Sequence, residues 1–167
     1  MSKIDEKKLQ EWMDKAAITE ALARYCRGVD RCDLEMVRSL YHEDAIDDHG
    51  IWKGPAFDFA DFIVERGKTS RRTLHYVSNV YIELRGPDKA VCEAYWASVK
   101  ETDGLPDFVG GRYLDTFERR NGEWKVSDRL IIFDIDRTDP VTGPFGGELR
   151  KGFTWGVRDR TEPYYAR

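Results

Sequence analysis

The sequence is poor in the residues that would indicate a metalloprotein, a disulfide-stabilised protein or a nucleic-acid-binding protein. It has three histidines, and their positions show none of the short paired spacings expected of zinc ligands. It has three cysteines, an odd number that predicts free thiols in a reducing cytoplasm. Its net charge of -4 argues against a nucleic acid partner, because phosphate binding needs a basic face. We therefore expect neither a metal site nor nucleic acid binding.

Other absences narrow the function further. No apolar run approaches the roughly 18 residues that a membrane span requires. The charged start at 1–8 has no apolar segment of the kind found in secretory signals. No glycine-rich phosphate loop follows a strand, and no Gly-x-Ser-x-Gly motif is present. These features predict a cytoplasmic protein that has no membrane partner and works without a cofactor.

Aromatic residues are abundant in a chain whose 167 residues fit one domain. Five Trp, eight Tyr and eight Phe amount to 13% of the sequence. Such side chains can line a pocket for a flat or ring-shaped ligand, or they can simply form a large aromatic core. Both interpretations remain open at this point.

Helical spacing dominates the first third of the chain. Apolar residues recur at intervals of four, three and four over 5–30, which predicts an amphipathic helix: Ile18, Leu22, Tyr25 and Val29. Asp33 is a candidate N-cap for a short helix whose buried face extends to Tyr41. A short strand is expected at 45–52, and the Gly54-Pro55 pair should open a helix that ends by residue 67.

The period changes to two after residue 71. Strands are expected at 73–84, 89–100, 111–119 and 123–136, with a loop at 102–106 and a hairpin turn at Asn121-Gly122. Helices followed by long antiparallel strands predict an α+β fold with helices packed on one face of a curved sheet. We expect one domain over 1–137. The tail at 138–167 either packs on it, crosses to a neighbouring subunit or is a loosely ordered terminus.

Two segments carry candidate catalytic groups. Asp30 ends the first helix in Tyr25-Cys26-Arg27-Gly28-Val29-Asp30, and His75 lies in the strand Thr73-Leu74-His75-Tyr76-Val77-Ser78-Asn79. A free imidazole titrates near pH 6.5, and a buried carboxylate on one ring nitrogen would fix its tautomer and orientation. If the fold joins the two residues, His75 becomes an oriented general base. Otherwise His75 is a core histidine and Asp30 a helix-end cap.

Three of these segments resemble the SnoaL-like family, which has a cone-shaped α+β barrel fold and includes scytalone dehydratase, hexachlorocyclohexane dehydrochlorinase and bile-acid 7α-dehydratase. The segment at 28–30 is similar to the helix end that holds the catalytic aspartate in these lyases. The segment at 73–76 is similar to the strand that presents their catalytic histidine. The segment at 117–125 is similar to the last hairpin of the family. The resemblance covers roughly 10–137. It implies helices on the concave face of a strongly curved, mostly antiparallel sheet.

The resemblance also implies a function. It suggests a cofactor-independent lyase of the dehydratase type in which Asp30 and His75 remove a proton and Tyr25 is a candidate donor. The substrate would be a small hydrophobic molecule with an aromatic or alicyclic ring. An isomerase, a polyketide cyclase and a non-catalytic ligand-binding protein are alternatives on this scaffold. By analogy alone we expect a homo-oligomer, a trimer or a dimer.

The chain departs from its relatives at two places. Scytalone dehydratase has a second active-site histidine on the next strand, and the region Val99-Lys100-Glu101 has none. The arginine expected on the last strand of the bile-acid enzyme is not evident, and Phe133 occupies roughly its place. The substrate of any one relative therefore does not carry over to this chain.

Further residues are candidates for substrate binding. They are Tyr41, Asp47, Trp96 and Tyr113. Asp47 belongs to the polar cluster Asp47-Asp48-His49, of which one member can face a cavity, although we expect an exposed loop there. We expect the remaining histidine, His42, on a helix surface.

Overall fold

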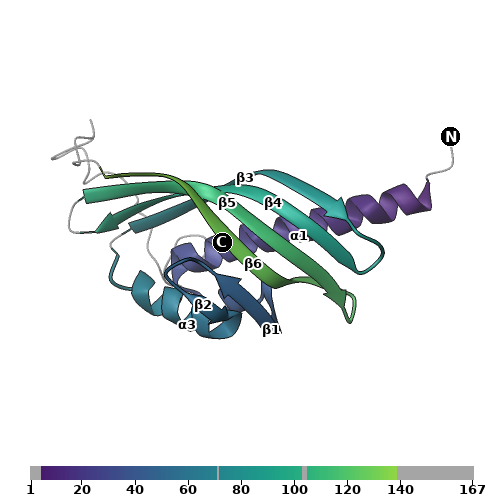
Figure 1. Ribbon diagram of the computed structural model, residues 1–167, viewed down its shortest axis with the longest axis horizontal. Coiled ribbons are helices and arrows are strands. Elements are labelled where there is room, and N and C mark those ends of the chain that lie inside the picture. The colour runs from purple at the N-terminus through teal and green to yellow at the C-terminus, as the bar shows by residue number, and fades with distance from the viewer. Residues whose placement is uncertain (1–4, 71, 103–104, 139–167) are drawn as a thin grey trace, which may run out of the picture.

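A long helix and a strongly curved sheet dominate the fold (Figure 1). A computed structural model describes residues 5–70, 72–102 and 105–138. The helices are α1 (Glu6–Arg31), α2 (Leu34–Arg38) and α3 (Ala56–Gly67). The strands are β1 (Tyr41–Asp48), β2 (Lys53–Pro55), β3 (Arg72–Leu84), β4 (Lys89–Thr102), β5 (Leu105–Arg120) and β6 (Glu123–Thr138). No helix in these ranges is both long enough and apolar enough to cross a membrane.

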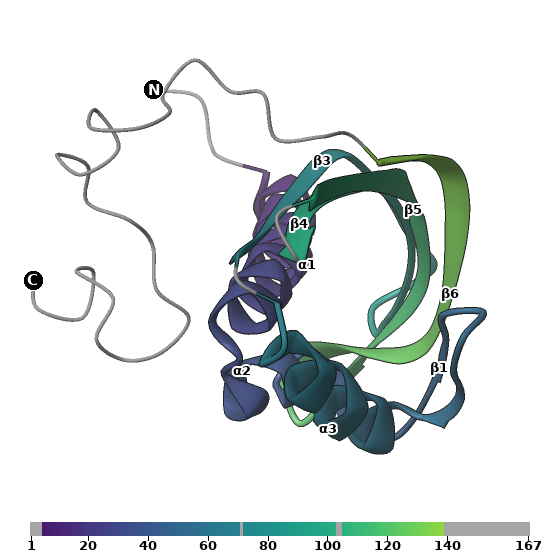
Figure 2. The same ribbon diagram turned by 90° about the vertical axis from the view of Figure 1, so that its left-hand side faces the viewer.

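The strands form one sheet in the order β2-β1-β6-β5-β4-β3. All neighbours are antiparallel except β1 and β6, which run parallel. The sheet curls strongly, and the helices fill its open side (Figure 2). A register shift between Gly110 and Gly111 brings the two backbones so close that a Cβ atom at Gly111 would overlap the carbonyl oxygen of Ile132. Such bulges bend a strand, so this one contributes to the curvature.

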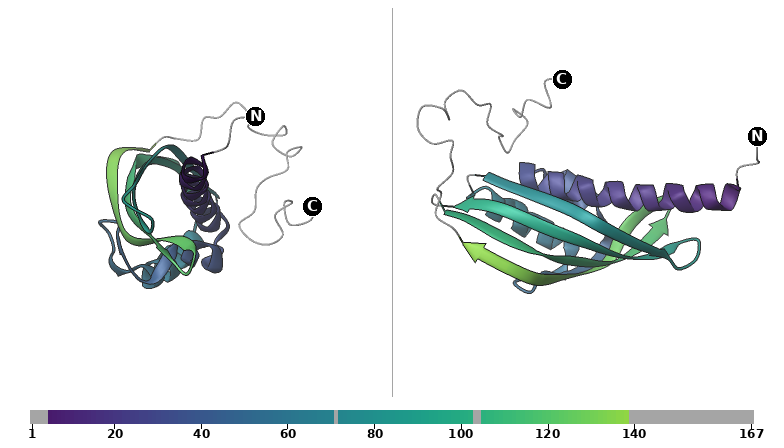
Figure 3. Two further views of the ribbon diagram at one scale, coloured as in Figure 1. Left: turned by 90° about the vertical axis from the view of Figure 1, so that its right-hand side faces the viewer. Right: turned by 90° about the horizontal axis from the view of Figure 1, so that it is seen from above.

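Helix α1 lies along the sheet, and its first turns extend beyond it (Figure 3). The side chain of Asp5 caps the start by accepting hydrogen bonds from the amides of Lys7 and Lys8. Cys32 ends the helix in the left-handed conformation with a φ of 52°. A Cβ atom at Gly28 would lie 2.9 Å from the amide nitrogen of Val37, so glycine permits the close packing of α2. These constraints fix the last turn of α1, where Asp30 is buried.

The apolar stripe predicted for the first helix is buried as expected, and the α+β class with its curved, mostly antiparallel sheet is confirmed. Three expectations were wrong in detail. Strand β1 begins at Tyr41 and not at residue 45, because the backbone amide of Val126 on β6 donates to Leu40. Strand β5 begins at Leu105, inside the expected loop, because it pairs with β4 up to Thr102.

The third correction concerns His42, which was expected on a helix surface. It lies in β1 with only 9% of its surface exposed, and its Nε2 is 2.9 Å from the carbonyl oxygen of Glu118. The tail at 139–167 lies outside the described residues, so the division at residue 137 stays a prediction, as does the homo-oligomer.

Candidate active site

Asp30 and His75 meet where the end of α1 packs against β3. The Oδ1 atom of Asp30 is 2.6 Å from Nδ1 of His75, and the backbone amide of His75 donates to Oδ2 at 2.9 Å. Both carboxylate oxygens therefore hold one residue, by its ring and by its backbone. The side chains are 8% and 14% exposed. Because a carboxylate only accepts hydrogen bonds, Nδ1 carries the proton and Nε2 is left for a ligand.

His75 lines a cavity of about 160 Å³ inside the curved sheet. A cavity of about 150 Å³ holds a benzene molecule, so this space matches one six-membered ring. Its apolar wall comes mainly from α1 and from β4, β5 and β6: Tyr25, Val29, Trp96, Tyr113, Ile131 and Phe133. Its charged lining is basic, with Arg66 and Lys100, and no Asp or Glu side chain lines it among the residues that the structure describes.

The aromatic part of the wall is tightly packed. The rings of Trp96 and Tyr113 stack with centroids 5.7 Å apart, and Phe133 meets Trp96 edge-on at 5.2 Å. Tyr25 contacts Tyr113 edge-on at 6.2 Å. Burial raises the pKa of the Tyr25 phenol well above its ordinary value of 10.0, so the phenol stays protonated near neutral pH. A protonated phenol at this wall can donate a hydrogen bond to a ligand.

The predicted residues thus fall into two groups. Tyr25, His75, Trp96 and Tyr113 line the cavity, and Asp30 supports His75 from behind. Tyr41 and Asp47 do not line it. They are buried in a polar layer that sequence reasoning did not foresee.

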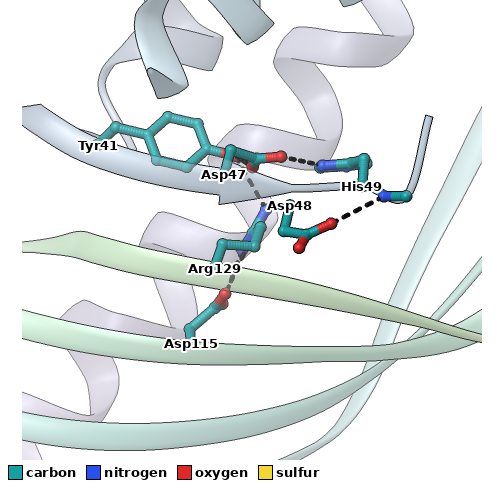
Figure 4. A network of polar contacts seen from close by, with 7 residues as sticks. Tyr41, Asp47, Asp48, His49, Asp115 and Arg129 are labelled. Atoms are coloured by element: carbon teal, nitrogen blue, oxygen red, sulfur yellow. Dashed lines mark hydrogen bonds and ion pairs between the residues drawn. The ribbon is translucent and has the colours of Figure 1, made fainter. Parts of the chain in front are cut away.

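This polar layer contains a chain of contacts that starts at a buried ion pair (Figure 4). The guanidinium of Arg129 on β6 donates to both carboxylate oxygens of Asp115 on β5, each at 2.7 Å. Its Nη1 lies 3.4 Å from the hydroxyl oxygen of Tyr41, whose O–H donates to Oδ2 of Asp47 at 2.8 Å. The Oδ1 atom of Asp47 contacts Nδ1 of His49. The chain ends at His49, which lines the cavity.

Arg129 is completely buried, and tyrosine rings surround it. Its guanidinium carbon lies 4.2 Å from the ring centre of Tyr113, 4.6 Å from that of Tyr25 and 5.6 Å from that of Tyr41. The electron-rich ring faces help to hold the cation there. The last strand thus carries an arginine four residues before Phe133, behind the cavity wall and not in it.

The expectation of an exposed loop at the Asp47-Asp48-His49 cluster was wrong. Asp47 is fully buried, and the side chain of His49 is only 11% exposed. The ring of His49 stacks on Phe59 with centroids 3.9 Å apart, while Asp48 faces away and pairs with Lys53. Residues two apart share one face of a strand, so the spacing of Asp47 and His49 was a signal that both point inward.

The protonation of His49 should make folding stability depend on pH. Burial lowers the pKa of His49 below its ordinary value of 6.5, and Arg129 adds to this, against the attraction of Asp47 and Asp115. The unfolded chain then binds a proton at His49 that the folded chain does not bind. The contribution of the neutral His49 to the free energy of unfolding is therefore complete above about pH 6.5, and it is lost as the pH falls below that value.

Urea denaturation between pH 7.5 and 5 measures this effect. The free energy of unfolding of the wild type should fall more steeply below pH 6.5 than that of His49→Gln, which has no group titrating at this position. Parallel curves for the two proteins would contradict the assignment of a neutral, buried His49.

Comparisons with known proteins agree with this architecture. The model of the SnoaL-like domain matches residues 10–130. A putative scytalone dehydratase from Novosphingobium aromaticivorans superposes with a TM-score of 0.72 at 18% sequence identity. The match covers 81% of this chain and 98% of the dehydratase chain. A hexachlorocyclohexane dehydrochlorinase from Novosphingobium barchaimii superposes with a TM-score of 0.73 at 20% identity, covering 82% and 99%.

A third solved structure has a different description. A putative aromatic ring hydroxylase from Novosphingobium aromaticivorans gives a TM-score of 0.69 at 23% identity, covering 76% of this chain and 94% of its own. The comparison with curated proteins finds no match. At these identities the solved structures establish the fold alone. Together with the match over 10–130, they lead to one conclusion: the chain belongs to the family of SnoaL-like domains.

Proposed function

We propose that this protein is a cofactor-independent lyase of the dehydratase type that acts on a small molecule with one aromatic or alicyclic ring. The observation that carries the proposal is the contact of 2.6 Å between Asp30 and His75, together with the position of His75 in the cavity wall. A neutral imidazole with one nitrogen held by a carboxylate has its other nitrogen ready to accept a proton.

The groups of this site can account for every proton and bond that changes in the elimination. Nε2 of His75 takes a proton from a carbon next to a carbonyl group, and the electron pair of that C–H bond forms the new C=C bond. The bond to the β-oxygen breaks, and hydroxide leaves with the bonding pair. His75 returns its proton to the hydroxide, which gives water and the neutral imidazole. Asp30 stabilises the imidazolium in between.

Two further features support elimination on a ring. The cavity of about 160 Å³ matches a single ring, and much of its wall is aromatic. The buried phenol of Tyr25 is protonated and can donate to the carbonyl oxygen, where negative charge develops. In addition, two structural neighbours are described as a putative dehydratase and a dehydrochlorinase, and both names denote eliminations.

The substitution Asp30→Asn tests the pairing. With 3-hydroxycyclohexanone as first substrate, elimination gives water and cyclohexenone, whose conjugated double bond absorbs in the ultraviolet. The asparagine amide would donate to Nδ1, so the proton would move to Nε2 and the base would be lost. We expect kcat to fall by about 100- to 10,000-fold.

A panel of other cyclic β-hydroxyketones extends this assay, and mass spectrometry separates its outcomes. A product lighter by one water supports the lyase. A product of unchanged mass would identify an isomerase, and binding without any product would identify a ligand-binding protein. Asp33→Asn is a matched control, since Asp33 caps α2 and does not line the cavity. Full activity in Asp30→Asn would refute the role of the pair.

A further inference from the structure

The cavity contains a second imidazole held by a buried carboxylate. His49 follows β1, near the opposite end of the sheet order from β3, and lines the same space as His75. We propose that His49, held by Asp47, determines specificity by accepting a hydrogen bond from a hydroxyl group on the ring of the ligand. The cavity would then select phenols and enols over analogues that lack the O–H group. This rests on the proposed function only in using the same cavity.

The hydrogen bonds behind His49 fix which ring nitrogen carries the proton. An arginine only donates, so Arg129 donates to the oxygen of Tyr41, and the hydroxyl proton of Tyr41 is directed to Asp47. A carboxylate only accepts, so Asp47 also accepts from Nδ1–H of His49. The neutral ring therefore presents Nε2 as an acceptor.

The ring itself is held in place on several sides. It stacks on Phe59 at 3.9 Å, and the backbone amide of His49 donates to the carbonyl oxygen of Trp52 at 2.8 Å. Nε2 has no hydrogen-bond partner among the described residues. An acceptor in a largely buried place gains most from a ligand that supplies a donor. Burial lowers the pKa of His49, which keeps the ring neutral and the acceptor available.

His49 differs from the other polar groups of the lining because its Nε2 accepts without donating, whereas the hydroxyls of Ser70, Thr73 and Ser98 can do both. Arg66 and Lys100 are cations that only donate. The second imidazole, His75, also leaves its Nε2 as an acceptor, and the variant His75→Gln separates its effect from that of His49. In the described wall, Nε2 of His49 thus matches a hydroxyl hydrogen on the ring of a ligand and offers no donor to an ether oxygen.

Binding of phenol and anisole tests the proposal, because anisole has the same ring and oxygen but no O–H. Isothermal titration calorimetry at pH 7.5 should give wild-type protein a preference for phenol of roughly tenfold, the effect of one net hydrogen bond. In Asp47→Asn the amide oxygen still accepts from Tyr41, but the amide N–H donates to Nδ1. The proton of His49 then moves to Nε2, which donates equally to both probes, so the preference should vanish.

Three variants serve as controls. Asp48→Asn makes the same change one residue away, on the other face of the strand, and should keep the preference. His75→Gln should keep it too, although it loses turnover, so the preference is separable from the proposed reaction. If Asp47→Asn fails to fold, His49→Phe retains the stacking on Phe59 and should also abolish the preference. A wild type without preference, or an Asp47→Asn protein that keeps it, would overturn the proposal.

Discussion

His75→Gln is expected to lower kcat for elimination by about 100- to 10,000-fold, the range that a positioned general base contributes. Glutamine is similar in reach and polar, but its amide cannot take a proton at neutral pH. Binding of ring ligands should change little, because the aromatic wall around Trp96 and Tyr113 is untouched. The loss should therefore appear in kcat rather than in KM, which steady-state kinetics with 3-hydroxycyclohexanone would measure.

The third histidine provides the matched control for this experiment. His42 is buried, as several side chains of the cavity wall are, but it does not line the cavity. Its Nε2 contacts the carbonyl oxygen of Glu118 instead. His42→Gln should keep turnover within a few fold. If His75→Gln retained wild-type kcat with an unchanged melting temperature, the base would have to be another group.

Arg129→Leu should lower the free energy of unfolding by about 3–5 kcal/mol, because it leaves a buried carboxylate without its counter-ion. The side chains of Arg129 and Asp115 have no exposed surface, and two hydrogen bonds of 2.7 Å join them. Loss of the guanidinium also removes the donor that faces Tyr41. Urea denaturation at pH 7.5 measures the effect.

The double variant Arg129→Leu/Asp115→Leu distinguishes an orphaned charge from a simple loss of packing. Replacing both members of a buried pair by apolar residues is often nearly neutral, so the double variant should regain part of the lost stability. The exposed pair of Arg120 and Asp44 is the control, and Arg120→Leu should cost at most about 1 kcal/mol. Equal losses for Arg129→Leu and Arg120→Leu would contradict this account.

Local signals in the sequence predicted much of this fold. The spacing of Ile18, Leu22 and Tyr25 indicated the buried face of α1, and Asp33 caps α2 as expected. The Asn121-Gly122 turn has positive φ angles of 54° and 84°, which that residue pair favours. These features depend on residues within a few positions of each other, so a single sequence contains the information.

The pairing of Asp30 with His75 needed more than local patterns. The two residues are 45 positions apart, and only the family resemblance gave a reason to expect that the end of α1 meets the first part of β3. The polar layer was missed for a related reason. Its members come from β1, β5 and β6, so the burial of Arg129 and Asp47 depends on strand order and not on neighbouring residues.

The polar residues at 47–49 were mistaken for a loop for a different reason. Three consecutive polar residues at 47–49 resemble a solvent-exposed loop when polarity alone is considered. Strand alternation separates them, with Asp47 buried and Asp48 paired outside with Lys53. A buried carboxylate is possible there because Tyr41 and His49 both supply hydrogen-bond partners.

The parallel seam between β1 and β6 has a consequence for how the chain reaches its native state. Tyr41 is aligned with Val126, so this contact closes a very long stretch of polypeptide. Contacts between such distant positions form slowly, because much chain entropy is lost before they are made. During synthesis, β1 cannot pair with β6 until β6, the last strand of the described residues, has left the ribosome. The half of the pocket that contains His49 is therefore completed late, after α1 and β3 have already emerged.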